Sequence, residues 1–481
     1  MKRFGRRRFL EGSMFAAAAA VGAGPVVNLY GDDKQSGGPN DRLNTAIVGV
    51  NGRGNSHIAG FGNRKDTPIT WIVDCDTAVG QKKVESIAKK QGFAPKFTTD
   101  MREMLEDKEV NIVSIATPNH WHSLGAIWAI QAGKDVYVEK PVSHNVSEGR
   151  RVVEAARKYN KICQTGTQCR SMPGTQLAIE YIKAGKIGDV TIARGLCYKT
   201  RKSIGPKGTY EIPASIDYNL WAGPAPMDPL TRPKFHYDWH WQWQAGNGDL
   251  GNQGIHQVDV ARWGLGVNEL SKGVMSYGGR LGYEDAGETA NTQVCQFDYG
   301  DKQLIFEVRG LNTDTYRGAK VGNVFHGTKG YVVLTSYDSG AAFDLEGNKI
   351  EEFKGKGDQA HFDNFVKAVR SRNYKELTAD IEEGHLSSAL CHLGNISLRL
   401  GQSMPISDVR AKLQGEANIE TYDRFAKHLE ENQVSPGTEI LCGLTLELDP
   451  KTEKFVNNSQ ADAMLTREYR APFVVPAAGQ V

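Results

Sequence analysis

The sequence predicts an α/β protein with an N-terminal parallel-sheet domain, followed by a C-terminal α/β domain whose sheet is largely antiparallel and open. Short apolar, β-branched runs at 45–50, 69–75, 110–116 and 135–138 alternate with longer stretches of helical character, as is typical of parallel βαβ units. From about residue 168 the strand candidates become longer and are separated by glycine-rich loops, which favours antiparallel pairing. Because 481 residues exceed what one hydrophobic core usually serves, two domains are expected.

The remaining elements follow from the periodicity of apolar residues. In the first domain, 44–167, helices are expected at 77–90, 120–132 and 147–159, with a last strand at 161–165. In the second domain, 168–400, strands are expected at 189–198, 292–297 and 303–309, and helices at 360–371 and 381–400. Residues 401–481 form a C-terminal extension that is less periodic, in which 444–448 can add one strand.

The first thirty residues resemble an export signal. Arg6-Arg7-Arg8-Phe9-Leu10 is a twin-arginine pattern, and the alanine-rich stretch from Ser13 to Val27 has the length of a signal's apolar region. We therefore expect a signal at 1–30, a linker at 31–43, passage through the twin-arginine translocase and a periplasmic or otherwise exported location. The alternative is an alanine-rich helix with a basic start.

Composition excludes several classes of protein. A hydrophobic content of 40% with 24% charged residues fits a soluble globular protein, and a net charge of +2 gives no electrostatic case for nucleic-acid binding. Seven cysteines without a CxxC pair argue against a disulfide framework or a metal cluster. No metal site is expected.

A glycine-rich turn directly follows the first expected strand. Gly49, Asn51, Gly52, Arg53 and Gly54 stand where the fingerprint of a Rossmann dinucleotide-binding domain must lie, between a strand and a helix. Such a turn aims backbone N–H groups and a helix N-terminus at a pyrophosphate. Asn51 replaces the usual second glycine, which is tolerable because asparagine visits left-handed backbone conformations more readily than most residues.

Asp74 ends the second expected strand, 25 residues after Gly49. This is close to the separation of about 20 residues at which a carboxylate accepts the ribose hydroxyls of NAD. The carboxylate favours NAD over NADP, although Arg53 or Arg64 could neutralise the 2′-phosphate of NADP. The alternative role for Asp74 is to cap the helix that begins near Thr77.

Two further motifs follow the fourth and fifth strands, and both lie at the edge of the sheet where ligands gather. Ala116-Thr117-Pro118-Asn119-His120-Trp121-His122 and Val138-Glu139-Lys140-Pro141 resemble the Gfo/Idh/MocA family of oxidoreductases over about residues 44–400. The resemblance implies that Lys140 hydrogen-bonds the substrate hydroxyl and helps to relay its proton. A cis bond at Lys140-Pro141 would aim the ammonium inward. The cofactor-side residues that it implies are Thr117, Pro118, Asn119, His122, Glu139 and Lys140.

A third segment, Gly248 to Asp259, resembles the substrate-side motif of the same family. His256 matches the family's histidine, and Asn252 stands in place of its aspartate. Asn252 and His256 are four residues apart and share a face if the segment is helical. An asparagine cannot accept a proton, so the general-base role moves toward His256, with Asn252 as an orienting hydrogen-bond partner. The alternative for His256 is a core histidine bonded to Asp259.

The segment Phe235 to Trp243 alternates aromatic and polar residues. An extended conformation would put its five aromatic side chains on one face. Such a face can stack on sugar rings, but a packed core face is the preferred interpretation.

The resemblance implies a NAD(P)-dependent oxidoreductase that transfers a hydride between a nicotinamide cofactor and a carbinol of a sugar or polyol. One alternative is a NAD-dependent glycoside hydrolase that oxidises the sugar transiently and eliminates the aglycone. A second alternative is a non-catalytic sugar-binding protein of the same fold. Members of the family often pair through the open sheet, so a homodimer or homotetramer is expected.

Overall fold

The computed structural model describes residues 42–481. The expected signal at 1–30 and residues 31–41 of the expected linker lie outside the described residues. In the described part of the chain, every helix is too short or too polar to cross a membrane.

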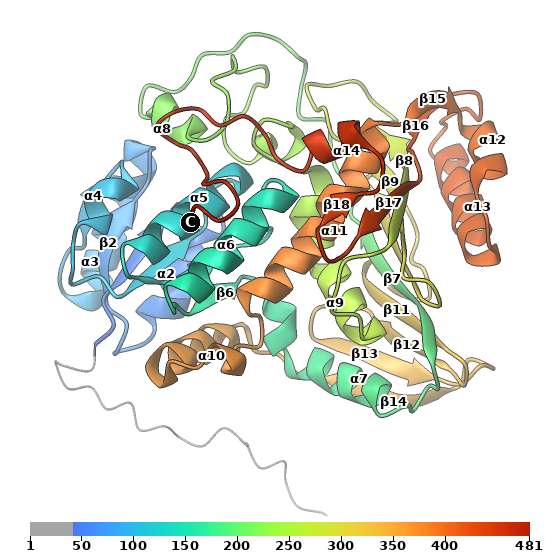
Figure 1. Cartoon of the computed structure of the whole chain (residues 1–481), viewed down its shortest axis with the longest axis horizontal. Helices are drawn as coiled ribbons and strands as arrows, with labels where there is room; N and C mark the ends of the chain where they lie inside the picture. Colours follow the sequence, from blue (N-terminus) through green and yellow to red (C-terminus); the bar gives the residue numbers. More distant parts are fainter. Residues whose placement is uncertain (1–41) are drawn as a thin grey trace, which may run out of the picture. The chain divides into compact units, whose positions relative to one another are not determined.

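The first domain is built on a six-stranded, fully parallel sheet in the order β3-β2-β1-β4-β5-β6 (Figure 1). The expected strands and helices are present, and the short strand β3 is added at one edge. The strands are β1 (Thr45–Val48), β2 (Ile69–Val73), β3 (Lys96–Thr98), β4 (Ile112–Ile115), β5 (Asp135–Val138) and β6 (Cys163–Thr165). The helices are α2 (Gly54–Gly62), α3 (Thr77–Gln91), α4 (Met101–Leu105), α5 (Asn119–Gln131) and α6 (Val146–Lys158).

Both faces of this sheet are covered, which is why its central strands are continuous apolar runs. Every residue of β1, β4 and β5 is buried. Helices α5 and α6 pack on one face. On the other face, Phe61 of α2 packs with Phe362 and Phe365 of α10 (Asp358–Ser371). A helix from the C-terminal half of the chain therefore completes the core of the first domain.

The second domain is built on a twelve-stranded sheet, in which β7 and β10 pair in parallel and the other pairs are antiparallel. The expectation of a largely antiparallel sheet is confirmed. Its strands are β7 (Val190–Tyr198), β8 (Gly273–Gly279), β9 (Thr292–Asp298), β10 (Gln303–Arg309), β11 (Val321–Gly327), β12 (Tyr331–Leu334), β13 (Ser339–Phe343), β14 (Lys349–Lys354), β15 (Gln402–Pro405), β16 (Glu439–Cys442), β17 (Leu446–Asp449) and β18 (Lys454–Phe455).

Helices cover both faces of the second sheet as well. Figure 1 shows α9 and α11 between this sheet and the first domain, while α12 and α13 lie on its far side. Helix α13 has 16 residues, although the weak periodicity beyond residue 401 predicts no helix there. The bounds are α7 (Pro173–Lys183), α8 (Tyr218–Ala222), α9 (Ile255–Leu265), α11 (Ile381–Arg399), α12 (Ile406–Val409), α13 (Glu416–Glu431) and α14 (Ser459–Ala463).

Candidate active site

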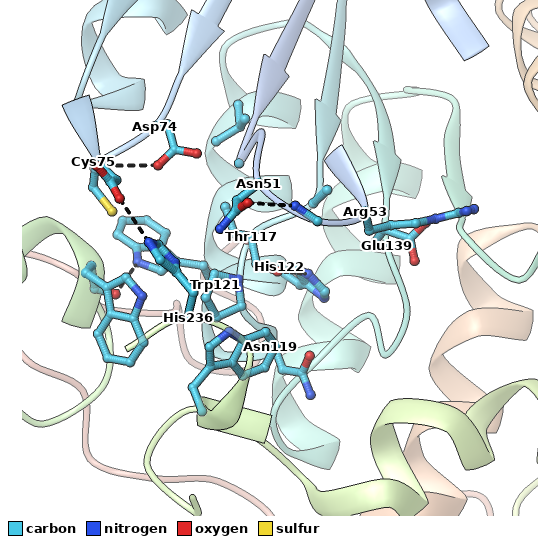
Figure 2. A pocket seen from close by; sticks show the side chains of 18 of the residues that line it. Asn51, Arg53, Asp74, Cys75, Thr117, Asn119, Trp121, His122, Glu139 and His236 are labelled. Carbon is cyan, nitrogen blue, oxygen red and sulfur yellow. Dashed lines mark hydrogen bonds and ion pairs between the residues drawn. The ribbon is translucent and has the colours of Figure 1, made fainter. Parts of the chain in front are cut away.

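A cavity of about 480 Å³ opens at the carboxyl edge of the parallel sheet, and Figure 2 shows many of its side chains. Its size lies within the ordinary range for small-molecule and cofactor sites. It contains every sequence-predicted site residue except Gly54. The predicted residues that line it are Gly49, Asn51, Gly52, Arg53, Asp74, Thr117, Pro118, Asn119, His122, Glu139, Lys140, Asn252 and His256.

The glycine-rich turn forms the floor of the cavity beside β1. Gly49 has a φ of +79°, and a Cβ there would lie 2.8 Å from the backbone of Ala116 and Thr117. Gly54 begins α2 and is packed against the Gly49 carbonyl, so it shapes the turn without lining the cavity. Gly52, with a φ of +56°, has open space where a Cβ would lie, so a ligand can approach the backbone closely there.

Asp74 is held against this turn by two backbone hydrogen bonds. Val50 N donates to its Oδ2 over 2.8 Å, and Asp76 N donates to its Oδ1 over 3.0 Å. Burial raises the pKa of Asp74, and these two hydrogen bonds oppose that effect. The capping alternative for Asp74 is wrong: Asp76 is the residue whose carboxylate accepts from the first N–H groups of α3.

Arg64 does not contribute to the cavity. It forms ion pairs with Asp66 and Asp363 and is absent from the lining. Of the two arginines considered for a 2′-phosphate, only Arg53 lines the cavity.

The cavity offers polar atoms that need a ligand. The hydroxyl of Thr117, Oε1 of Gln168 and Nδ1 of His256 are buried without a hydrogen-bond partner among the described residues. Buried polar groups are almost always hydrogen-bonded, so these atoms are suited to bind a polar ligand. Together with the open glycine turn and the Asp74 carboxylate, they match what a dinucleotide requires.

Glu139 is a buried carboxylate that joins three elements. Its Oε1 accepts from Arg53 Nε over 2.8 Å and lies 3.1 Å from Nε2 of His57, a buried residue of α2. The Lys140 N–H donates to its other oxygen over 3.2 Å. Although burial alone would raise the pKa of Glu139, the charge of Arg53 and the His57 contact hold it well below its usual value. The ionised Glu139 thereby fixes the position of the Lys140 backbone.

Lys140 points into the cavity from the end of β5. Its Nζ donates to the backbone carbonyl of Asn252 over 2.8 Å, and its bond to Pro141 is cis. Burial and the nearby positive charge of Arg53 lower the pKa of Lys140, although Glu139 opposes them. A lysine with a lowered pKa exchanges protons more readily near neutral pH.

His256 faces the same cavity from the start of α9. Its ring packs against that of Tyr337, with the centroids 5.1 Å apart. Burial and the positive charge of Lys140 place the pKa of His256 well below its usual value, so the imidazole is neutral at pH 7 and can accept a proton. The core alternative is wrong, because Asp259 binds Arg170 over 2.8 Å instead.

The segment that carries Asn252 is not a regular α-helix. Residues Leu250–Gly254 form one π-helical turn, and α9 begins only at Ile255. This turn still directs Asn252 and His256 to the same cavity, and it directs the Asn252 carbonyl at Lys140. Short π-helical turns are frequent at functional sites.

Asn119 and His122 support the rim of the cavity from α5. Asn119 Nδ2 donates to Oδ1 of Asn247 over 3.1 Å. The ring nitrogens of His122 lie 2.5 Å from the Pro141 carbonyl and 2.8 Å from the Thr117 carbonyl. His122 thereby connects the two motif-bearing loops.

The extended conformation expected for Phe235 to Trp243 is wrong. Asp238–Trp241 forms a 3₁₀ turn. Phe235 and Trp241 are buried, whereas Tyr237 is 52% exposed and lines the cavity with Trp239. Local hydrogen bonding along the turn overrides the alternating pattern, so neither the single aromatic wall nor the single core face exists.

Sequence reasoning missed several other residues of the cavity. Trp121 stands inside a motif that was recognised, but its indole gave no separate signal. Trp221 comes from α8 and Tyr337 from the loop between β12 and β13, and only the three-dimensional structure brings them to the site. The lining residues that had not been predicted for it include Trp121, Gln168, Ile216, Trp221, His236, His240 and Tyr337.

The chain belongs to the Gfo/Idh/MocA family of oxidoreductases. Residues 43–167 match the model of the oxidoreductase family's NAD-binding Rossmann fold, and residues 192–425 match that of its C-terminal α/β domain. The first domain is therefore an NAD-binding Rossmann domain, and the resemblance drawn from the motifs is confirmed.

Two curated proteins match this chain over part of its sequence. Levoglucosan dehydrogenase of Pseudarthrobacter phenanthrenivorans is 31% identical over 241 residues, covering 49% of this chain and 54% of that protein. An alpha-N-acetylgalactosaminidase of Shewanella oneidensis is 26% identical over 201 residues, covering 38% and 44%. The chain thus spans about half the length of the curated relatives it matches.

Solved structures share the fold. A levoglucosan dehydrogenase in complex with NADH and levoglucosan superposes with a TM-score of 0.57 at 19% identity, covering 73% of this chain and 95% of that one. The WlbA dehydrogenase of Bordetella pertussis, in complex with NADH and UDP-GlcNAcA, gives a TM-score of 0.54 at 20% identity, covering 73% and 94%.

Proposed function

We propose that this protein is an exported, NAD-dependent oxidoreductase that transfers a hydride between the nicotinamide ring and a carbinol of a sugar or polyol. One observation supports this most strongly. The amine of Lys140 and the imidazole of His256 line the same cavity as the dinucleotide turn, although the two residues come from different domains.

In this proposal, separate groups of residues bind the cofactor, position Lys140 and transfer the proton. Gly49, Asn51 and Asp74 hold the dinucleotide at the sheet edge, and the ionised Glu139 fixes the backbone that presents Lys140. When bound, NAD supplies a nicotinamide ring that can accept a hydride. Burial in the cavity excludes water and strengthens the electrostatic contacts of the charged groups.

Lys140 and His256 would handle the proton. Neutral His256 accepts the proton of the sugar hydroxyl, while the Lys140 ammonium hydrogen-bonds the same oxygen and stabilises negative charge on it. The Asn252 carbonyl holds the ammonium in place through the 2.8 Å hydrogen bond. The low pKa of His256 makes it a weak base, so the contribution of the Lys140 charge is essential.

The direct test is to mix the full chain with NAD and a panel of pyranosides, including levoglucosan and uronic acid derivatives, and to record absorbance at 340 nm. NADH formation with at least one sugar is expected, and it should be lost in both Lys140→Ala and His256→Ala. Unchanged turnover in both variants would place the proton transfer on other residues. Sugar binding without NADH formation or aglycone release would support a non-catalytic sugar-binding protein instead.

A second candidate function is glycoside cleavage through transient oxidation of the sugar. It is favoured by relatives named alpha-N-acetylgalactosaminidase and glycosyl hydrolase family 109 protein. Oxidation of a ring carbon acidifies the neighbouring C–H, which permits elimination of the aglycone. Aryl glycosides separate the two functions: aglycone release without net NADH formation would select cleavage.

Export and assembly are part of the same proposal. Replacement of Arg7 and Arg8 by lysine should keep the protein in the cytoplasm if the twin-arginine translocase recognises it. We propose a homodimer or homotetramer, and a monomeric mass by light scattering would contradict it.

A further inference from the structure

A long segment between β7 and α9 crosses the cavity. We call residues 210–241 the strap. It contains only α8 and a 3₁₀ turn as regular structure, and long irregular loops in compact domains are usually functional. Figure 1 shows α8 beside the first domain, with the last part of the chain running across it.

The strap is bonded to the lip of the cavity formed by the end of β2 and the start of α3. Asp217 N donates to the Cys75 carbonyl over 3.0 Å, and Thr77 N donates to the Ser215 carbonyl over 2.9 Å. Nε2 of His236 lies 2.9 Å from Oδ2 of Asp76. This lip is the one beside Asp74.

The strap is also bonded to the opposite lip, at the start of α5. Trp121 Nε1 donates to the carbonyls of Leu220 and Trp221 over 2.9 and 3.0 Å. His120 Nε2 donates to the same Trp221 carbonyl over 2.8 Å. A Cβ at Gly223, whose φ is +50°, would lie 2.3 Å from the Trp121 indole, so only glycine allows this close approach.

The C-terminal residues 466–481, which we call the tail, fasten the strap from outside. Arg470 donates to the side chain and the carbonyl of Asn219 over 2.6 and 2.7 Å. Phe473 packs edge-on against Trp121, with the ring centroids 5.5 Å apart. The tail lies beyond residue 425, where the match to the family's C-terminal domain ends.

The underside of the strap faces the cofactor end of the cavity. Ile216, Trp221 and His236 line the same cavity as Asp74 and the glycine turn. A ligand that occupies this end lies between the turn and the strap. The contacts with Asp76 and Trp121 hold the strap over this end at both lips.

We propose that the strap and the tail retain NAD as a slowly exchanging cofactor, with Asp76, His236 and Arg470 acting as positioning residues for it. The inference rests on the proposed binding of NAD. It assigns a role to the tail, which holds the strap closed without contacting the cavity.

The test uses the full-length protein loaded with NADH, desalted, and then mixed with excess NAD. The decay of NADH fluorescence reports the release rate. Retention through desalting and release over minutes or longer are expected. Arg470→Ala should release NADH about tenfold faster, because two hydrogen bonds that hold the strap are lost.

Arg410→Ala is the matched control. Arg410 forms an exposed ion pair with Asp423 in the region of α13, so its removal should leave the release rate unchanged. Asn219→Ala removes the side-chain partner of Arg470 and keeps the backbone carbonyl, so it should speed release less than Arg470→Ala, and in the double variant the two effects should be less than additive.

Complete release by the unaltered protein during desalting, or equal release rates in Arg470→Ala and the unaltered protein, would overturn the inference while leaving the proposed function intact. Failure to bind NADH at all would overturn the proposed function itself. Asn219→Ala keeps the test decisive if Arg470→Ala does not fold.

Discussion

The two sides of the cavity are built by different means. The turn after β1 presents its backbone, and its shape is set by the Gly49 conformation and the carboxylate of Asp74. The strap presents side chains such as Trp221 of α8 and Trp239 of the 3₁₀ turn from a segment that is otherwise irregular, and its position depends on contacts with distant residues. One side is therefore fixed by local geometry and the other by tertiary packing.

We infer that the turn side binds the cofactor and that the strap side selects the sugar. A backbone turn can recognise the part that every dinucleotide shares, whereas exchangeable side chains on a loop can adapt to different sugars. We expect substitutions on the turn side to reduce cofactor binding or chemistry strongly. Those on the strap side should change cofactor exchange and sugar preference more moderately.

The largest effect is expected for Lys140→Met. It removes the ammonium while keeping an apolar stem, and the rate of hydride transfer should fall about a thousandfold, within the usual range for loss of a proton-transfer group. NADH formation at 340 nm in a single turnover of protein preloaded with NAD measures this rate, because cofactor release does not limit it. Lys427→Met, which alters an exposed ion pair on α13, should leave the rate unchanged; a similar fall in both variants would contradict the role of Lys140.

Gly49→Ala should lower the affinity for NAD about a hundredfold. The added Cβ would meet the backbone 2.8 Å away at a φ of +79°, and relief of about 2–3 kcal/mol of strain would distort the turn. Gly92→Ala is the control, because Gly92 has a φ of +85° with open space around it. Calorimetric titration should show weaker NAD binding only for Gly49→Ala, and equal affinities would refute the close approach at the turn.

A pH-dependent stability is expected from His120, which holds the strap to α5. Burial lowers its pKa to about 3, so between pH 6.5 and pH 3 the unfolded chain binds a proton that the folded chain does not. Its contribution is complete above pH 6.5 and is lost as the pH falls. Between pH 7.5 and pH 5, it should cost about 2 kcal/mol of unfolding free energy.

Urea unfolding of the unaltered protein and of His120→Gln at both pH values measures this difference. The stability of His120→Gln should vary less with pH, by about 2 kcal/mol. Identical pH dependence in the two proteins would mean that His120 is protonated when folded.

Asp74→Ser should weaken NAD binding about tenfold and reduce the preference for NAD over NADP. The substitution removes a carboxylate that can accept ribose hydroxyls and repel a 2′-phosphate. Fluorescence titration with NADH and NADPH tests both effects, and an unchanged ratio of affinities would place the selecting group elsewhere.

The smallest effect is expected for Trp239→Leu on the strap. Loss of a stacking surface should raise the KM for the preferred sugar severalfold while kcat changes little. A large fall in kcat instead would show that the strap participates in the chemistry, which would erase the contrast between the two sides.

Much of the fold could be predicted because the parallel strands are apolar runs whose burial leaves a local signature. The turn at 49–54 and the motifs that carry Thr117 and Lys140 are local for the same reason. The strap was not predictable, since its conformation depends on Asp76, Trp121 and Arg470, which are far apart in the sequence.

The segment from Phe235 to Trp243 shows how a local pattern can mislead. Strict alternation of polar and aromatic residues favours a strand, but a 3₁₀ turn with a Tyr237 φ of +66° forms instead. Asn252 shows a milder failure, because its spacing from His256 suggested a shared helix face, whereas a π-helical turn brings both to the cavity.

The most direct test of the account is energy transfer from tryptophan to bound NADH. With Trp121, Trp221 and Trp239 lining the cavity, excitation at tryptophan wavelengths should produce saturable NADH emission that excess NAD abolishes. The signal should fall in Trp239→Leu. If NADH binds but gives no sensitised emission, the nucleotide does not lie between the glycine turn and the strap, and the account is contradicted.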